Sequence, residues 1–511
     1  MPPDWQKLNQ PTSTYVLCAI SRNDCRLTRC DVGQVVLIDM LPDDVLLDIF
    51  DLYVDKAPGE DEHPFKDLST KKEIESWQSL VHVCRRWRCV VFGSPRRLKL
   101  RLVYTHKTTV RDTLDVWPAL PLLIKGNVSY TSWADKFVAV LEHSELVEKI
   151  DLYGQDATLP FEKVFAAMQK SLPELTVLVL QLHFIFGTVS PVLLDSFLGG
   201  SAPRLRRLEL KGILFPGLPR LLLSATRLVN LKLCNIPHSG YISPKEMVAT
   251  LSALTSLVQL KLQFESRRSR PGRTRPPPPS TRSALPVLTS LSFSGVGEYL
   301  DDLVACIDAP RLDNLSITFF DQVVFNTPHL VQFISRIPTL KALKETHIFF
   351  EDTAAWVSSQ SGYGMLSVKI PSNRGLDNHV MSLEMICTSC LPLSMSEDLY
   401  IYENIYWSRD WQDEFQDRLW LNLFRPFTAV KSLYVSEVIV PHVVPSLQEL
   451  VGGGTTDVLP SLQNIFLEKL QRLERDQEVV GKFVAAHQLS GHPITVSLWE
   501  REFCFVDFYD Q

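Results

Sequence analysis

The chain has 511 residues, more than one compact domain usually contains, which indicates either several domains or an elongated repeat body. Apolar residues make up 45% and charged residues 22% of the chain, a balance typical of folded proteins and not of disordered ones. The formal net charge of -6 argues against a general nucleic-acid binder, because such proteins need an excess of lysine and arginine.

The sequence also predicts no contact with a membrane. The longest apolar stretch, residues 177–194, is interrupted by polar residues well short of the ~20 apolar residues that a membrane-spanning helix needs. Residues 15–20 form an apolar run shorter than the about 7–15 residues at the centre of a signal peptide. The ten cysteines follow no disulfide spacing. We therefore expect a cytoplasmic or nuclear protein.

The first predicted helix lies in a segment over residues 35–98 whose apolar pattern is helical. Residues 1–34 before it lack periodicity and carry several prolines, which predicts a mobile arm. Leu41 and Pro42 lead into an acidic pair, as at the start of a helix, where the helix dipole favours negative charge. Apolar residues then recur every three or four positions: Val45, Leu46, Ile49, Phe50 and Tyr53.

A loop and a second helix complete this segment. Residues 55–70 contain two prolines, a glycine and the acidic run at 60–62, so they predict a loop. Residues 71–91 then predict one helix with an apolar side, formed by Ile74, Trp77, Leu80, Val81, Cys84 and Trp87.

The two ends of this segment resemble the two ends of the F-box motif. Leu-Pro-Asp-Asp-Val-Leu-Leu-Asp-Ile-Phe at residues 41–50 is similar to its first part, and Val-Cys-Arg-Arg-Trp-Arg at residues 83–88 to its last part. The resemblance covers about 55 residues, with a longer loop between the ends than is usual, as in large fungal sets of F-box proteins. It implies a small all-helical module that binds a Skp-type adaptor of a cullin–RING ubiquitin ligase. The matching residues imply the adaptor contacts: Leu41, Pro42, Val45, Leu46, Ile49, Phe50, Val83, Cys84 and Trp87.

A leucine motif repeats in the remainder of the chain. Residues 99–140 predict a linker and first capping region, and residues 141–511 the repeat body. The pattern Leu-x-x-Leu-x-Leu recurs, and successive copies between Val147 and Leu312 start 23 to 31 residues apart, close to the leucine-rich-repeat range of roughly 20–29. One such unit cannot bury its own apolar face, so units stack into a solenoid. The predicted fold class is α/β: a helical F-box module followed by a leucine-rich-repeat solenoid with a curved parallel sheet and outer helices. An ordinary sheet protein with leucine-rich strands is the alternative.

Three segments depart from the regular repeat. Residues 266–284 carry six arginines around four consecutive prolines, which predicts a disordered insertion. It serves either as a simple linker or as a contact for a partner or for nuclear import. Residues 339–430 contain degenerate units whose number the spacing does not decide. Residues 458–511 predict an atypical C-terminal cap with a strand, a helix to about residue 488 and a last strand at 494–499.

The strands of the repeat predict a surface for a target protein. Side chains alternate along a strand, so the residues beside the buried leucines point away from the core. In the early repeats this exposed set is polar and basic: Arg207, Glu209, Lys211, Asn230, Lys232, Gln259, Lys261 and Gln263. A partner with an acidic patch suits it, and a solvated surface without a ligand is the alternative.

No motif for catalysis is found in the sequence. It lacks a nucleophile elbow, a phosphate-binding glycine loop and a zinc-protease helix. Cys387 and Cys390 have metal-ligand spacing, but no second pair lies nearby, so we expect no metal and no cofactor. We predict a non-enzymatic substrate receptor that binds the Skp-type adaptor and an unknown target protein. The alternative is a leucine-rich-repeat scaffold that takes no part in ubiquitination.

Overall fold

The computed structural model divides the chain into two compact units, Met1–Leu102 and Val103–Gln511, named here the helical unit and the repeat unit. The predicted mobile arm, the acidic loop and most of both the Arg/Pro insertion and the C-terminal helix lie outside the described residues. The structure describes residues 41–54, 76–105, 117–128, 131–155, 158–183, 191–269, 281–320, 327–351, 353–362, 364–371, 376–389, 391–403, 417–443, 446, 458–468, 481, 484–485 and 494–500.

The helical unit contains three described helices, α1 (Asp43–Val54), α2 (Ser76–Val81) and α3 (Arg85–Gly93). They pack around a core that includes Leu46, Phe50 and Trp77. The single helix predicted over residues 71–91 is wrong, because the chain breaks between α2 and α3. Cys84 adopts an extended conformation at the break, and its Sγ accepts a hydrogen bond from the backbone N–H of Trp87 at 3.4 Å, which caps α3.

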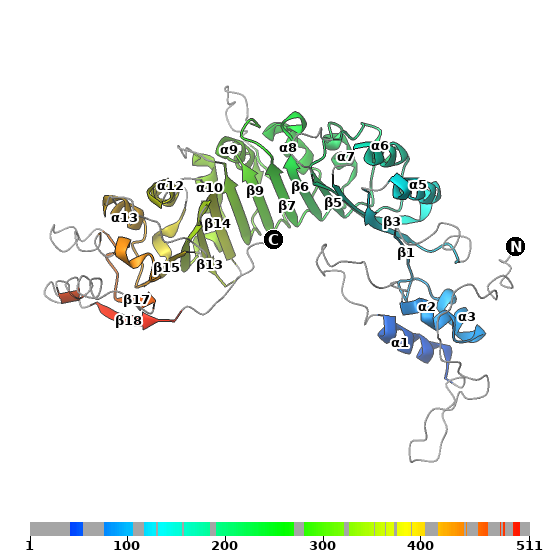
Figure 1. Cartoon of the computed structure of the whole chain (residues 1–511), viewed down its shortest axis with the longest axis horizontal. Coiled ribbons are helices and arrows are strands. Elements are labelled where there is room, and N and C mark those ends of the chain that lie inside the picture. The colour runs from blue at the N-terminus through cyan, green and yellow to red at the C-terminus, as the bar shows by residue number, and fades with distance from the viewer. Residues whose placement is uncertain are drawn as a thin grey trace, which may run out of the picture. The chain divides into compact units, whose positions relative to one another are not determined.

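The repeat unit is built on one large sheet, which contains sixteen strands among the described residues (Figure 1). Its first nine positions are occupied by β1 (Leu102–Tyr104), β2 (Leu122–Asn127), β3 (Val147–Gln155), β4 (Val177–His183), β5 (Arg207–Lys211), β6 (Asn230–Ile236), β7 (Gln259–Phe264), β9 (Ser290–Gly295) and β11 (Asn314–Phe319). Two further short strands, β8 (Ser283–Ala284) and β10 (Ile307–Asp308), pair separately in parallel.

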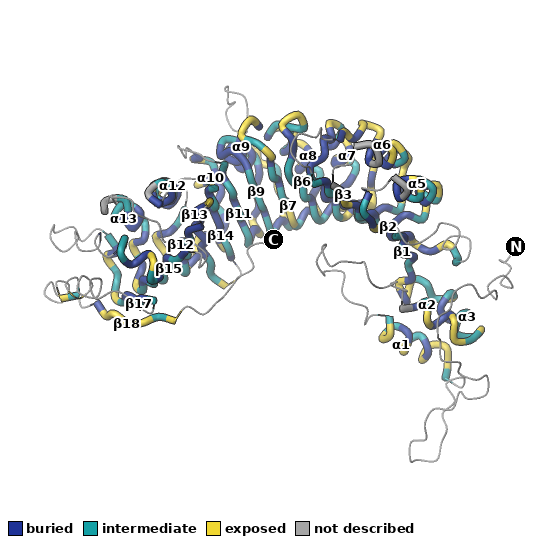
Figure 2. Tube along the Cα trace, in the orientation of Figure 1, coloured by how far each residue is buried: buried dark blue, intermediate teal, exposed yellow. Residues whose placement is uncertain are grey.

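The strand register explains the leucine repeat. The second leucine of each motif pairs with its counterpart on the next parallel strand, in the series Leu178, Leu208, Leu231, Leu260, Leu291 and Leu315. All of these side chains are buried. Figure 2 shows buried residues alternating with less buried ones along the strands. The expected α/β class with a large parallel sheet is therefore confirmed.

Helices cover one face of this sheet, on the outer side of its curve (Figure 1). They are α5 (Thr131–Val140), α6 (Thr158–Ala167), α7 (Leu218–Ser224), α8 (Pro244–Leu251), α9 (Gly297–Ala305), α10 (Pro328–Arg336), α11 (Pro338–Lys341), α12 (Leu376–Ser389) and α13 (Asp417–Phe424). Short 3-10 turns lie at η3 (Leu141–Leu146), η4 (Phe197–Gly200), η5 (His238–Gly240) and η6 (Leu393–Met395). The pairing of strand with helix begins at β2 and α5, inside the residues expected to form a linker and first cap.

The second part of the sheet departs from the expected parallel order. It contains β12 (Glu345–Glu351), β13 (Ala354–Ser361), β14 (Gly364–Pro371), β15 (Asp398–Glu403), β16 (Ser432–Val435), β17 (Asn464–Glu468) and β18 (Thr495–Trp499). The order is β11-β14-β13-β12-β15, and β13 runs antiparallel to both of its neighbours. The chain passes from β11 through α10 and α11 to β12, then returns through two tight turns. Antiparallel strands allow such turns, whereas parallel strands need a long crossover.

Candidate interaction surfaces

Exposed apolar side chains follow one side of α1. Val45, Ile49, Leu52 and Tyr53, named here the α1 stripe, are 37%, 41%, 68% and 48% exposed. Their spacing of four, three and one residues places them on one face of a helix. Val83, in the turn between α2 and α3, is 55% exposed. Such exposed apolar groups offer a surface that a partner could cover.

The nine residues expected to contact an adaptor divide between the core and the surface. Leu46 and Phe50 are fully buried, and the Phe50 ring packs against Trp87 at a centroid distance of 4.7 Å. They therefore belong to the core, which corrects their place among the contact residues. Leu52 and Tyr53 were not among the expected contacts, although Tyr53 belongs to the apolar pattern of the predicted helix and both lie beside Ile49 on the exposed side. The exposed members of the expected set are Pro42, Val45, Ile49 and Val83, whereas Leu41, Cys84 and Trp87 are half-buried.

Arg86 connects the first turns of α1 and α3. Its guanidinium donates to Asp43 Oδ1, with the Nε–Oδ1 distance at 3.1 Å, and also to the backbone oxygen of Leu41. The Arg86 and Asp43 side chains are both partly exposed, so the ion pair adds little stability. Its effect is to hold the start of α1, and with it the α1 stripe, in place.

The face of the sheet that carries no helices, named here the open face, presents the residues expected to bind a target. The register places Arg207, Asn230 and Gln259 in one row across β5, β6 and β7. Glu209, Lys232 and Lys261 form the next row, and Lys211 and Gln263 lie two residues further along their strands. The structure therefore brings this predicted set together on one surface.

Glu209 neutralises part of the positive charge in this region. Its carboxylate pairs with Arg207 at 3.0 Å and accepts a hydrogen bond from Gln181 Nε2 at 2.7 Å. Lys211, Lys232 and Lys261 supply the remaining cations of these strands. Burial raises the pKa of the neighbouring Cys234 thiol, which keeps it protonated and unreactive at neutral pH.

Small side chains cover the middle of the open face. Ser292, Ser316, Ser367 and Ser358 pair in register across β9, β11, β14 and β13. On one side, Ser292 pairs with Lys261, so this row continues the row of Lys232 and Lys261. On its other side it leads to His347 of β12. The same row therefore changes from basic to small and then to aromatic along the sheet.

The aromatic end of the open face is a stack of rings, named here the aromatic ladder: His347, Tyr400, Tyr434 and Phe466. These residues pair in register across β12, β15, β16 and β17. Successive rings lie nearly parallel, at centroid distances of 4.6, 4.2 and 4.4 Å. Trp499 of β18 lies against Tyr400 and Tyr434 at 6.0 and 5.6 Å.

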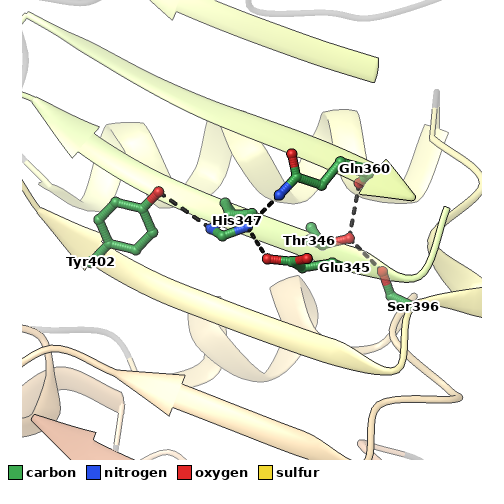
Figure 3. Close-up of polar contacts among 7 residues, drawn as sticks. Glu345, Thr346, His347, Gln360, Ser396 and Tyr402 are labelled. Atoms are coloured by element: carbon green, nitrogen blue, oxygen red, sulfur yellow. Dashed lines mark hydrogen bonds and ion pairs between the residues drawn. The ribbon is translucent and has the colours of Figure 1, made fainter. Parts of the chain in front are cut away.

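Polar contacts hold the first ring of the aromatic ladder (Figure 3). His347 Nε2 lies 2.7 Å from Glu345 and 3.4 Å from Gln360, and His347 Nδ1 lies 3.3 Å from the hydroxyl of Tyr402. The hydrogen bond to His347 lowers the pKa of the Glu345 carboxyl, which stays ionised at neutral pH. On the core side of the same strand, Thr346 shares hydrogen bonds with Ser359 and Ser396.

A second aromatic row lies beside the aromatic ladder. Phe349 contacts Trp356 at 5.0 Å and Tyr402 at 5.1 Å, both in edge-to-face geometry. Lys369 of β14 places its ammonium 4.5 Å from the Trp356 ring and 3.2 Å from Glu351. Sequence reasoning missed this whole region. The sequence does carry a pattern for it, because an aromatic residue or histidine stands at an outward position of each of several short apolar segments. Aligning these residues, however, requires the order of the segments in the sheet.

Comparisons with known proteins add one likeness. No protein family matches the chain, and no curated protein matches it. One solved structure that matches is a leucine-rich-repeat protein. This protein, LegL7 from Legionella pneumophila, is 14% identical, and the match covers 71% of this chain and 95% of that one with a TM-score of 0.26. At that TM-score the likeness carries no argument, and the repeat architecture rests on the strand register.

The cysteine pair with metal-ligand spacing and the expected lack of a membrane-spanning helix concern other parts of the chain. Cys387 is buried in α12, and Cys390 lies outside the described residues. In the part of the chain that the structure describes, no helix is both long enough and apolar enough to cross a bilayer.

Proposed function

We propose that this chain is a non-enzymatic substrate receptor of a cullin–RING ubiquitin ligase. The helical unit binds a Skp-type adaptor, and the open face of the repeat unit binds a target protein. The chain acts by tethering, because holding both partners on one molecule raises the effective concentration of the target near the transferring enzyme. In this scheme no residue of the chain takes part in covalent chemistry.

The α1 stripe is the observation that carries this proposal. Four apolar side chains between 37% and 68% exposed line one face of a helix of twelve residues. Covering apolar surface contributes roughly 25 cal/mol per Å², so a partner that buries this stripe gains affinity. The stripe lies within the part of the sequence that resembles the first half of the F-box motif, and Val83 opens the part that resembles its second half.

The open face supports the second half of the proposal. Polar, small and aromatic side chains from neighbouring strands align on it, and none of the described helices covers it (Figure 1). Solenoids use such an extended, curved surface to bind partners. The lysines at positions 211, 232 and 261 suit an acidic patch of the target at that end.

Co-purification with a Skp-type adaptor tests the proposal. The full chain carrying both Ile49→Asp and Leu52→Asp should bind the adaptor roughly 30-fold more weakly than the wild type, because a central apolar anchor contributes ~2 kcal/mol or more. Leu46→Asp is unsuitable, since Leu46 is fully buried and its loss would unfold the helical unit. Asp44→Asn, on an exposed position of the same helix outside the α1 stripe, is the matched control.

Circular dichroism should show unchanged helix content for each variant. If the wild-type chain is folded and fails to bind the adaptor, the ligase assignment is wrong. The chain is then a repeat-type interaction scaffold whose helical unit serves another purpose.

A further inference from the structure

The aromatic ladder lies at the opposite end of the open face from the lysines, and the proposed function assigns it no particular ligand. We propose that the aromatic ladder, with the carboxylates beside it, binds a basic segment of a partner protein through arginine side chains. This inference rests on the proposal that the repeat unit binds a protein. It does not depend on the adaptor contact.

The aromatic ladder is a preformed surface. Because its rings stack across neighbouring strands within 10° of parallel, each ring covers the faces of its neighbours and turns its edge away from the sheet. Trp499 lies at 69° to Tyr434 and 59° to Tyr400, and so restrains both rings. Rings that are already held in place lose little side-chain entropy when a partner binds, which is why tyrosine and tryptophan are effective interface residues.

The strand positions around the aromatic ladder are acidic, and the lysines that directly precede β12 and β16, Lys344 and Lys431, pair with Glu397. The open-face positions of β12 and β15 to β18 include four carboxylates and neither lysine nor arginine: Glu345, Glu351, Asp398 and Glu468. Glu345 and Asp398 pair in register immediately beside His347 and Tyr400. Lys369 of β14 contacts Glu351, at the far end of β12 from Glu345. A cationic ligand is therefore attracted to this end of the sheet.

The same face repels that ligand at its other end. The open-face positions of β5 to β7 carry Arg207, Lys211, Lys232 and Lys261 against the single carboxylate Glu209. Complementary charge contributes mainly to selecting the partner and its orientation. A basic segment consequently binds over β12 to β18 rather than over β5 to β7.

The available groups favour arginine over lysine. Carboxylates and tyrosine hydroxyls offer hydrogen-bond acceptors, and the planar guanidinium can donate to a carboxylate through two N–H groups at once. The partner segment must reach several strands at once, so it needs more than one arginine.

Three labelled peptides of twelve residues test this inference with the full chain: (Arg-Gly)6, (Lys-Gly)6 and (Glu-Gly)6. Fluorescence anisotropy at 150 mM salt should show that the arginine peptide binds roughly fivefold more tightly than the lysine peptide, because only the guanidinium donates to a carboxylate through two N–H groups in a fixed geometry. The glutamate peptide should not displace the arginine peptide, because it is repelled from this end of the face. Equal affinities for the arginine and lysine peptides would overturn the inference.

Paired variants locate the binding site. Tyr400→Leu with Tyr434→Leu, and separately Glu345→Gln with Asp398→Asn, should each weaken binding of the arginine peptide roughly tenfold, as expected for loss of central anchors. Lys232→Ser with Lys261→Ser is the matched control on the same face and should leave that affinity unchanged. Wild-type affinity in both of the first two variants, or loss of binding in the control, contradicts the site.

Photo-crosslinking covers the case in which a leucine variant misfolds. A benzophenone at the centre of the arginine peptide should attach to residues 398–403, 432–435 or 464–468 of the wild-type chain. Crosslinks confined to residues 207–264 would contradict the inference. A chain that binds the peptide at this site but not the adaptor would disprove only the ligase assignment, and the reverse result would disprove only the arginine site.

Discussion

Asp301 of α9 accepts hydrogen bonds from the backbone of Leu330 in α10. Its Oδ1 lies 3.0 Å from the Leu330 nitrogen and 2.9 Å from that of His329, and the Asp301 side chain is fully buried. The N-cap residue of α10, Thr327, makes no side-chain capping bond. A carboxylate from one repeat therefore caps the helix of the next, which couples the two repeats through charge-assisted hydrogen bonds.

Replacing this carboxylate should weaken the repeat unit. We expect Asp301→Ala to lower the free energy of unfolding by about 2 kcal/mol, because a buried N–H group and a partly buried one lose their acceptor. Asp301→Asn keeps an acceptor oxygen and should cost clearly less. Urea unfolding followed by circular dichroism measures both variants. Equal losses for alanine and asparagine would show that the hydrogen bonds contribute nothing specific.

Adjacent residues of α1 should respond very differently to truncation. Phe50 is fully buried against Trp87, so Phe50→Ala should cost about 3–5 kcal/mol and unfold the helical unit. Ile49 is 41% exposed, and Ile49→Ala should change the free energy of unfolding by less than about 0.5 kcal/mol. Limited proteolysis between residues 41 and 102 reports the difference. A large loss of protection in Ile49→Ala would mean that the α1 stripe is internal.

Gly126 of β2 lies against Trp133 of α5, so the effect of enlarging Gly126 should depend on the side chain at position 133. A Cβ added at Gly126 would overlap the indole ring of Trp133, which is almost fully buried. Gly126→Ala should therefore destabilise the repeat unit by about 1–3 kcal/mol through overpacking. In the background of Trp133→Leu the same substitution should cost much less, because the smaller side chain leaves room. Additive losses in a double-mutant cycle would exclude this contact as the cause.

The sequence predicted best those features that depend on neighbouring residues. The apolar spacing from Val45 to Tyr53 indicated α1, and the leucine motif indicated the strands around Leu208 and Leu231 together with their outward lysines. Each of these follows from the local period of a helix or a strand. Whether Leu46 or Ile49 faces the core could not be decided, because that depends on where α3 places Trp87.

The aromatic end of the open face needed information that a single strand does not hold. His347 and Tyr400 are far apart in the chain and stack only because β12 pairs with β15. That pairing exists because β13 and β14 fold back to fill the positions between β12 and β11. Tight turns, in place of crossover helices, join β12 to β13 and β13 to β14. The regular spacing of the leucine motif is therefore absent from these strands. The aromatic ladder could not be found before the strand order was known.

Half-buried His442, within the helical residues 440–443 that follow β16, should make stability depend on pH. Burial lowers its pKa from 6.5 to about 4, so between these values the unfolded chain binds a proton that the folded chain does not. This contribution to stability is present above pH 6.5 and is lost as the pH falls toward 4. His442→Gln removes it, so the urea midpoint of the wild type should fall relative to that of the variant over this range. A constant difference between the two midpoints from pH 7.5 to 4.5 would show that His442 titrates alike in both states.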